Sequence, residues 1–138
     1  MTYGTVGGGR QFGDGNASEL VLGSQGAPAT MTSTAAITAA QLATGIIYGS
    51  PGSSAATYTL PTVALWEAGQ AGNAHVDSSF DFFIINVDGS GSGVITLAIG
   101  TGWTLGVGSA VVAAVAQTGS HWRARKTAAG AWTVYRLT

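Results

Sequence analysis

The sequence predicts an all-β fold, a mainly antiparallel β-sandwich or small barrel with one or two short helices, that follows an extended glycine-rich N-terminal arm. Turn-forming residues recur about every 10–15 positions, a spacing typical of sandwiches and barrels. After residue 79, β-branched and aromatic residues fill most of the runs between these turns. Residues 1–28 differ, because they are rich in glycine and almost free of apolar runs.

The chain has 138 residues, which is the length of one domain. We divide it into an extended arm, residues 1–28, and a β-rich domain, residues 29–138. The sequence contains no cysteine, which excludes disulfides and cysteine-ligated zinc. A chain of this length can bury a core without such cross-links.

The composition predicts a protein whose surface is largely covered. Charged residues make up 8 % of the chain, against about 25 % in a typical soluble domain, while apolar residues make up 46 %. Such a surface promotes association. The net charge of −1 gives no basic footprint, so we expect no nucleic-acid partner.

Two segments are the candidates for a membrane-spanning helix and for a signal peptide. The longest weakly polar run, residues 106–116, is too short to cross a membrane as a helix. The first residues, MTYGTVGGGRQFG, lack the apolar segment of a signal peptide. We therefore expect no membrane partner and favour a permanent protein assembly.

The arm carries apolar residues that a pure linker would lack, so we expect it to become ordered on a neighbouring protein. The alternative is a disordered leader without a role. The candidate contact residues are Tyr3, Arg10, Phe12, Leu20 and Leu22.

The first half of the domain predicts strands and two short helices. The segment 31–37 alternates like a strand. Thr38 and Gln41 form a capping-box pattern, and Gly45 stands where a short helix would end. A short strand is then expected from residue 46. A loop rich in Pro, Gly and Ser follows it, and Pro61 ends the next strand.

The second helix is expected over Thr62–Ala68, with Thr62 as its N-cap. Leu65 and Trp66 would then pin this helix to a sheet. A polar loop follows, up to about residue 79.

From residue 79 we expect only strands. In the strand 79–87, Phe80, Phe82 and Ile84 share one face, and both faces are mostly apolar, which predicts a central position. A Gly/Ser turn would join it to 94–99 as a hairpin. Further strands are expected over 109–117, 121–127 and 132–138, the last two as a terminal hairpin.

Few residues offer chemistry. His75, Asp77 and Asp81 lie near one another and could ligate a metal, but a solvated loop is the favoured interpretation. No Ser-His-Asp order, paired-glutamate pattern or Gly-x-Ser-x-Gly motif is present. We expect no enzyme activity, no metal and no cofactor.

The segment HWRARK places basic residues around a tryptophan. Such a pattern can bind nucleic acid, but in a chain of net charge −1 we interpret it as a strand at a protein interface. Arg136 on the partner strand could extend the same patch. The possible subunit-interface residues are Trp122, Arg123, Arg125 and Arg136.

Three longer segments carry a resemblance: AAQLATGIIYGSPGSSAATYTLPTVALWEA, SFDFFIINVDGSGSGVITLAIGTGWTL and WRARKTAAGAWTVYRLT. They resemble small structural proteins of tailed bacteriophages, above all the capsid decoration, or cement, protein. The resemblance covers roughly residues 35–138 and leaves residues 1–30 outside.

The resemblance implies a homotrimer on the outer surface of the virion capsid, with the major capsid protein and its own copies as partners. It would stabilise contacts between capsomers. Similar segments also occur in tail-fibre proteins, so the alternative is a tail-fibre or receptor-binding tip that binds host carbohydrate. That alternative predicts that Trp103, Trp122 and Trp132 are partly exposed.

Overall fold

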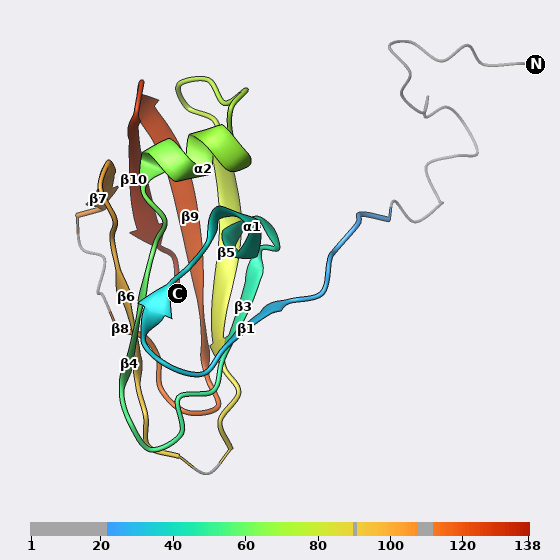
Figure 1. Cartoon of the computed structure of the whole chain (residues 1–138), viewed down its shortest axis with the longest axis vertical. Coiled ribbons are helices and arrows are strands. Elements are labelled where there is room, and N and C mark those ends of the chain that lie inside the picture. The colour runs from blue at the N-terminus through green and yellow to red at the C-terminus, as the bar shows by residue number, and fades with distance from the viewer. Residues whose placement is uncertain (1–21, 90, 108–111) are drawn as a thin grey trace, which may run out of the picture.

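A computed structural model of the chain describes residues 22–89, 91–107 and 112–138 (Figure 1). The strands in these ranges are β1 (Ala29–Met31), β2 (Ala35–Ala36), β3 (Ile46–Gly49), β4 (Ala56–Thr59), β5 (Ser79–Asn86), β6 (Ile95–Ala98), β7 (Trp103–Leu105), β8 (Val112–Ala114), β9 (Gly119–Ala128) and β10 (Ala131–Arg136). The helices are α1 (Ala39–Ala43) and α2 (Val63–Gly69).

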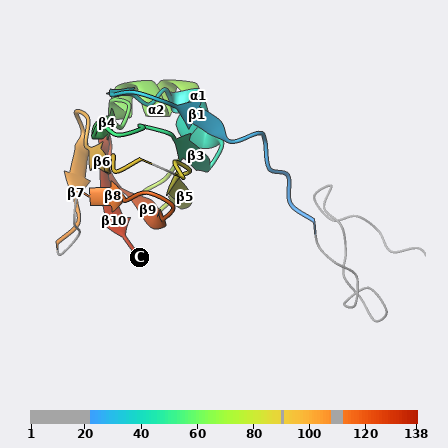
Figure 2. The same cartoon turned by 90° about the horizontal axis from the view of Figure 1, so that it is seen from below.

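The strands form two sheets that share one core. The six-stranded sheet has the order β1-β3-β5-β9-β10-β7, and the four-stranded sheet has the order β2-β4-β6-β8. Seen from below, the strands of both sheets surround the core (Figure 2). The expected β-rich fold with two short helices is therefore confirmed at this level.

The expectation of mainly antiparallel pairing is wrong, because both sheets are mixed. Strands β1, β3 and β5 are parallel in one sheet, and β2, β4 and β6 are parallel in the other. From β1 to β9, successive strands alternate between the two sheets. Helices α1 and α2 lie on the return paths and supply the crossovers that parallel strands need.

The hairpin expected over 79–99 is also wrong. β5 and β6 lie in different sheets, so the Gly/Ser segment between them is a corner from one sheet to the other. A Cβ atom on Gly93 would meet the carbonyl oxygens of Gly52 and Ser54. Glycine is needed here for close approach to the loop after β3.

The strand expected over 31–37 is interrupted because the chain also passes from one sheet to the other within it. Met31 ends β1 in the six-stranded sheet, and the chain crosses before β2 begins at Ala35. Of the strand expected over 109–117, residues 109–111 lie outside the described residues, and β8 covers Val112–Ala114. Trp103 begins β7.

The terminal hairpin is confirmed. β9 pairs antiparallel with β10, and Gly130 in the connecting turn has φ +68°. The other edge of β9 pairs antiparallel with β5, which makes β5 an inner strand of its sheet, as expected. The outer edge of β10 pairs with β7 in parallel.

Both helices begin as the sequence predicts. The Thr38 hydroxyl accepts from the Gln41 amide at 3.1 Å, and the Gln41 side chain accepts from the Thr38 amide at 2.9 Å. The Thr62 hydroxyl accepts from the Leu65 amide. Trp66 is buried in the core, as expected, but Leu65 is 62 % exposed, so Val63 and Trp66 anchor α2 and Leu65 does not.

The core lies between the sheets and contains a row of aromatic rings. Phe80 packs on Trp66 and on Phe82, and Phe82 stacks on Trp122 with ring centroids 6.4 Å apart. Tyr58 faces this core from β4, and its hydroxyl donates to the Met31 carbonyl at 3.0 Å. Residues 22–28, before β1, form no helix or strand and extend away from the sheets (Figure 1).

Replacing Gly49 by alanine is expected to destabilise the fold by about 1–3 kcal/mol, because overpacked cores distort. The new Cβ would meet the Ile95 side chain and lie 2.8 Å from the Tyr58 hydroxyl. Urea unfolding would measure the loss. The control is Gly26→Ala, where a Cβ meets nothing within 4 Å. Equal stability of the two variants would contradict the prediction.

Candidate functional site

The outer face of the six-stranded sheet carries an apolar strip. Along β5, Phe82 and Ile84 point into the core, so Phe83 and Ile85 point outward. On β3, Ile46 lies opposite Phe83 and Tyr48 lies opposite Ile85. We call Ile46, Tyr48, Phe83 and Ile85 the outer strip. Phe83 is 40 % exposed, whereas Ile46, Tyr48 and Ile85 are partly buried.

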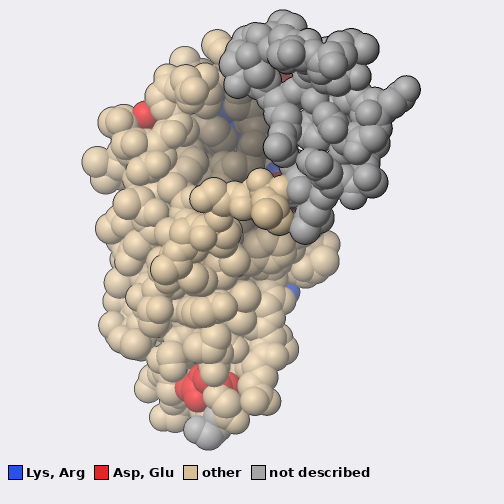
Figure 3. Space-filling view, turned by 90° about the vertical axis from the view of Figure 1, so that its right-hand side faces the viewer, with Lys and Arg blue, Asp and Glu red and all other residues tan. Residues whose placement is uncertain are grey.

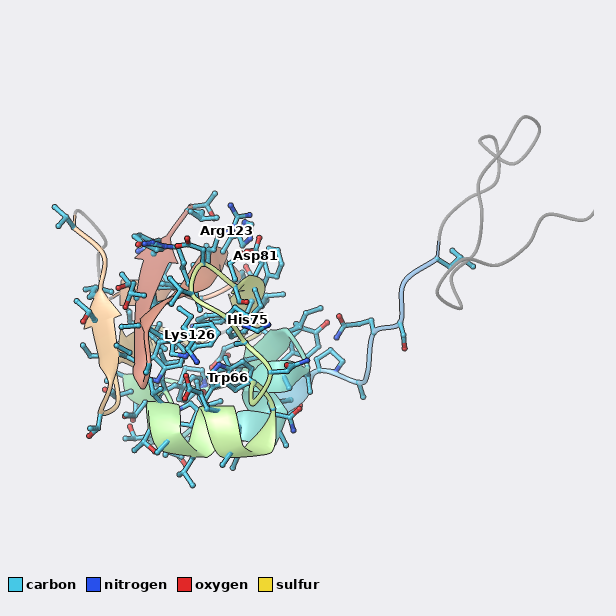
Figure 4. All side chains as sticks on the ribbon, turned by 90° about the horizontal axis from the view of Figure 1, so that it is seen from above. Trp66, His75, Asp81, Arg123 and Lys126 are labelled. Carbon is cyan, nitrogen blue, oxygen red and sulfur yellow. The ribbon has the colours of Figure 1, made fainter. Side chains whose placement is uncertain are left out.

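A charged cluster borders the outer strip. Asp81 accepts from Arg123 Nε at 2.6 Å and from Arg123 Nη2 at 2.9 Å, and its Oδ2 lies 2.8 Å from His121 Nε2. The His121 ring stacks on Phe83, with ring centroids 4.4 Å apart. Figure 4 shows Asp81 and Arg123 side by side on adjacent strands.

The pKa of the Asp81 carboxyl is lowered to about 2, first by its hydrogen bond with Arg123 and, against some desolvation, also by that with His121. The carboxylate is therefore ionised and already engaged by two side chains. It has no nucleophile beside it among the described contacts. Such a cluster is suited to the polar rim of a protein contact.

The metal trio does not come together. Asp81 contacts Arg123 and His121, while Asp77 lies 3.5 Å from Arg125. In the part of the chain that the structure describes, no three His, Asp or Glu side chains are grouped to hold a metal ion. Within the same residues, no helix has the length and apolarity to cross a membrane.

The possible subunit-interface residues separate onto two faces. Arg123 and Arg125 lie on the outer face, with side chains 50 % and 39 % exposed. Trp122 is 0 % exposed, and its Nε1 donates to the Ser120 hydroxyl at 2.7 Å. Its assignment to an interface is wrong, because this side chain fills the core of its own chain.

Arg136 does not extend the outer patch either. It lies opposite Trp122 in the β9–β10 pairing, so it shares the face of Trp122 and not that of Arg123. Its guanidinium lies 5.8 Å from the centre of the Trp122 ring. Of the arm residues, Tyr3, Arg10, Phe12 and Leu20 lie outside the described residues, and Leu22 is 80 % exposed.

A pocket near α2, which sequence reasoning missed, is the second candidate site. We call it the upper pocket; its volume is about 390 Å³. The residues that matter for its chemistry are Trp66, Gln70, Asn73, Ser79, Phe80 and Trp132. All but one lie in the continuous stretch 66–80, which contains α2, the loop after it and the start of β5, and β10 supplies Trp132. Sequence reasoning missed the pocket because it interpreted the segment after α2 as a solvated polar loop.

An ion pair holds the loop beside the upper pocket. Lys126 Nζ lies 2.7 Å from Glu67 Oε1 and donates to the Ala74 carbonyl at 3.2 Å. Trp132 Nε1 donates to the same Glu67 oxygen at 3.0 Å. The hydrogen bond from Lys126, then that from Trp132, lowers the pKa of Glu67. Figure 4 labels Lys126, Trp66 and His75 in the same part of the view.

One buried donor in the wall of the upper pocket lacks a partner. Trp66 Nε1 is buried and makes no hydrogen bond. An unsatisfied buried N–H costs about 1–3 kcal/mol, so proteins rarely retain one without a reason.

Comparison with known proteins gives no match: no family model, no curated protein and no solved structure is similar to this chain.

The exposure expected for a carbohydrate platform is not observed. Trp103, Trp122 and Trp132 are 5 %, 0 % and 2 % exposed. The prediction of partly exposed rings at these positions is therefore wrong, and the three indoles belong to the core.

Asp81 is expected to make stability depend on pH in the acid range. Its lowered pKa adds stability that is complete above the unfolded value of 3.8 and is lost as the pH falls toward about 2. Because Arg123 is half exposed, we expect Asp81→Asn to cost only about 1 kcal/mol above about pH 5, and nothing near about pH 2.

Urea unfolding at several pH values would measure this difference. The control is Asp77→Asn, because Asp77 is 75 % exposed and its contact with Arg125 is longer. A cost for Asp81→Asn that does not change between these pH values would contradict the assignment.

Proposed function

We propose that this chain is a capsid decoration protein of a tailed bacteriophage, located on the outer surface of the virion. It binds the major capsid protein as a homotrimer and stabilises contacts between capsomers, without catalysis. The observation that carries the proposal is the outward-facing apolar strip on the six-stranded sheet, in which Phe83 is exposed, together with the sequence resemblance over residues 35–138.

The composition of the outer strip suits a protein partner. Phe83 and Tyr48 are aromatic, and Arg123 borders them, which are residue types enriched in the centres of protein interfaces. A sheet face made of such residues offers a contact area whose backbone is already held by strand pairing.

The charges of the chain favour contact through shape rather than electrostatic attraction. Among the described residues, ion pairs join Glu67 to Lys126, Asp81 to Arg123 and Asp77 to Arg125. Figure 3 shows few charged atoms among the coloured atoms of one face. Burying such a surface carries a small desolvation cost.

The proposed architecture is a β-sandwich that presents its outer face, with residues 1–28 as an arm that reaches a neighbour. Gln25 Nε2 donates to the Thr44 carbonyl, which ties the described end of the arm to the turn after α1. The sandwich would provide the rigid clamp, and the arm would add further contacts by avidity.

The tail-fibre alternative predicts exposed aromatic rings that are not observed. Its aromatic platform required exposed rings at Trp103, Trp122 and Trp132, and all three are buried. We therefore do not propose it as the main function.

The native mass of the purified chain over a wide concentration range tests the oligomeric state. We expect a stable trimer, because a largely apolar surface with little charge favours association. A persistent monomer would contradict the homotrimer, and a capsid-binding assay would then test binding by single copies.

Phe83→Lys is expected to weaken binding to capsids that lack this chain by at least about tenfold, since a central interface aromatic contributes more than about 1 kcal/mol. The matched control is Leu65→Lys, an exposed apolar residue on α2. A capsid co-sedimentation assay measures both. If the two variants bind alike, the outer strip does not contact the capsid.

Deleting residues 1–28 is expected to weaken capsid binding while the trimer of residues 29–138 stays folded. The described core contains none of the deleted residues. Circular dichroism and native mass would check the fold, and co-sedimentation the binding. Binding as tight as that of the full chain would contradict the role of the arm.

A further inference from the structure

We propose that the upper pocket binds a neutral sugar residue of a glycan. This inference concerns a different surface from the outer strip and does not depend on the capsid proposal. It stands on the shape of the pocket, on the chemistry of its lining and on the hydrogen bonds that hold its rim.

Aromatic rings form the inner wall of the pocket. Phe80 lies 4.7 Å from Trp66 and 6.3 Å from Trp132, measured between ring centroids. Both indoles are buried, whereas Phe80 is only half-buried, so Phe80 is the ring of the three with the most exposed surface. An aromatic ring of this kind packs against the C–H face of a pyranose.

Polar side chains without charge line the rest. Gln70 and Asn73 are exposed amides, each able to donate and to accept, and Ser79 adds a hydroxyl. None of the side chains that line the pocket is charged, so a phosphate or carboxylate would find no cation there. A sugar ring has an apolar C–H face, which can pack on the aromatic wall, and several hydroxyls, which can hydrogen-bond to these polar side chains.

Trp66 supplies a probe for binding at this wall. Its Nε1 is buried without a hydrogen-bond partner, and the residue forms part of the pocket wall. A sugar that packs against the wall changes the surroundings of the indole ring, so the indole N–H reports its binding without bonding to it.

The rim of the pocket is fixed before any ligand arrives. The Asp77 amide donates to the Lys126 carbonyl, and the Lys126 amide donates to the Ser78 carbonyl, both at 2.9 Å. The His75 amide donates to the Ser78 hydroxyl at 2.9 Å. With the Lys126 side chain on Ala74, these bonds tie the loop to β9, which lowers the cost of ordering it on binding.

The size of the pocket fits one ring. Ligand pockets range from about 300 to 1,000 Å³, so about 390 Å³ lies at the small end. Figure 3 shows a hollow in the surface toward the end of the molecule that carries α2. We expect a dissociation constant of about 1 mM for a single monosaccharide and tighter binding for a glycan that also contacts the rim.

The test titrates the full, ¹⁵N-labelled chain with glucose, galactose, mannose, N-acetylglucosamine and rhamnose, followed by NMR. For at least one sugar we expect saturable shifts of the Trp66 indole N–H, assigned with Trp66→Phe, and of amides in residues 70–80. Asn73→Ala should weaken that binding at least fivefold. Ser53→Ala, an exposed truncation in the loop after β3, should leave it unchanged.

Glucose 6-phosphate is the charged probe, and it should bind no better than glucose. Three results would overturn the proposal: no saturable shift with any sugar of the panel, shifts that Asn73→Ala leaves unchanged, or shifts confined to residues away from the pocket. None of these results bears on capsid binding, because the capsid assays use Phe83 and the arm.

Discussion

The pairing of β5 with both β3 and β9 is the constraint on which the rest of the structure depends. β3 joins it in parallel and carries the passes that alternate between the sheets, while β9 joins it antiparallel and carries the terminal hairpin. If β5 were removed, the parallel part and the antiparallel part would have no common sheet. The row of aromatic rings in the core also includes two residues of β5, Phe80 and Phe82.

Features set by neighbours in sequence were predictable. The caps at Thr38 and Thr62, the terminal hairpin and the two faces of β5 each depend on a few adjacent residues, and all are confirmed. The pairing of one strand with another is instead decided by contacts between residues far apart in the sequence. A Gly/Ser corner between two sheets and a hairpin turn have the same composition, so the sequence could not distinguish them, and the parallel pairing was missed.

The candidate sites also contain some features that the sequence predicted and others that it could not predict. Alternation along β9 correctly placed Arg123 and Arg125 on one face, but it could not reveal that Asp81 and Asp77 of the same chain pair with them. Trp122 was assigned to an interface because composition alone does not separate a core tryptophan from an exposed one. The upper pocket was missed because the segment after α2 was interpreted as a solvated loop, and the contact of this segment with Trp132 of β10 is between residues far apart in the sequence.

The two proposed contacts use the same strand and still need not compete. Side chains alternate along β5, so Phe80 points toward the upper pocket while Phe83 points outward to the strip. A partner on the sheet face would bury Phe83 and leave the opening beside Phe80 on the opposite face of the strand. Binding of a sugar should therefore be independent of capsid attachment, which follows from the two-residue period of a strand.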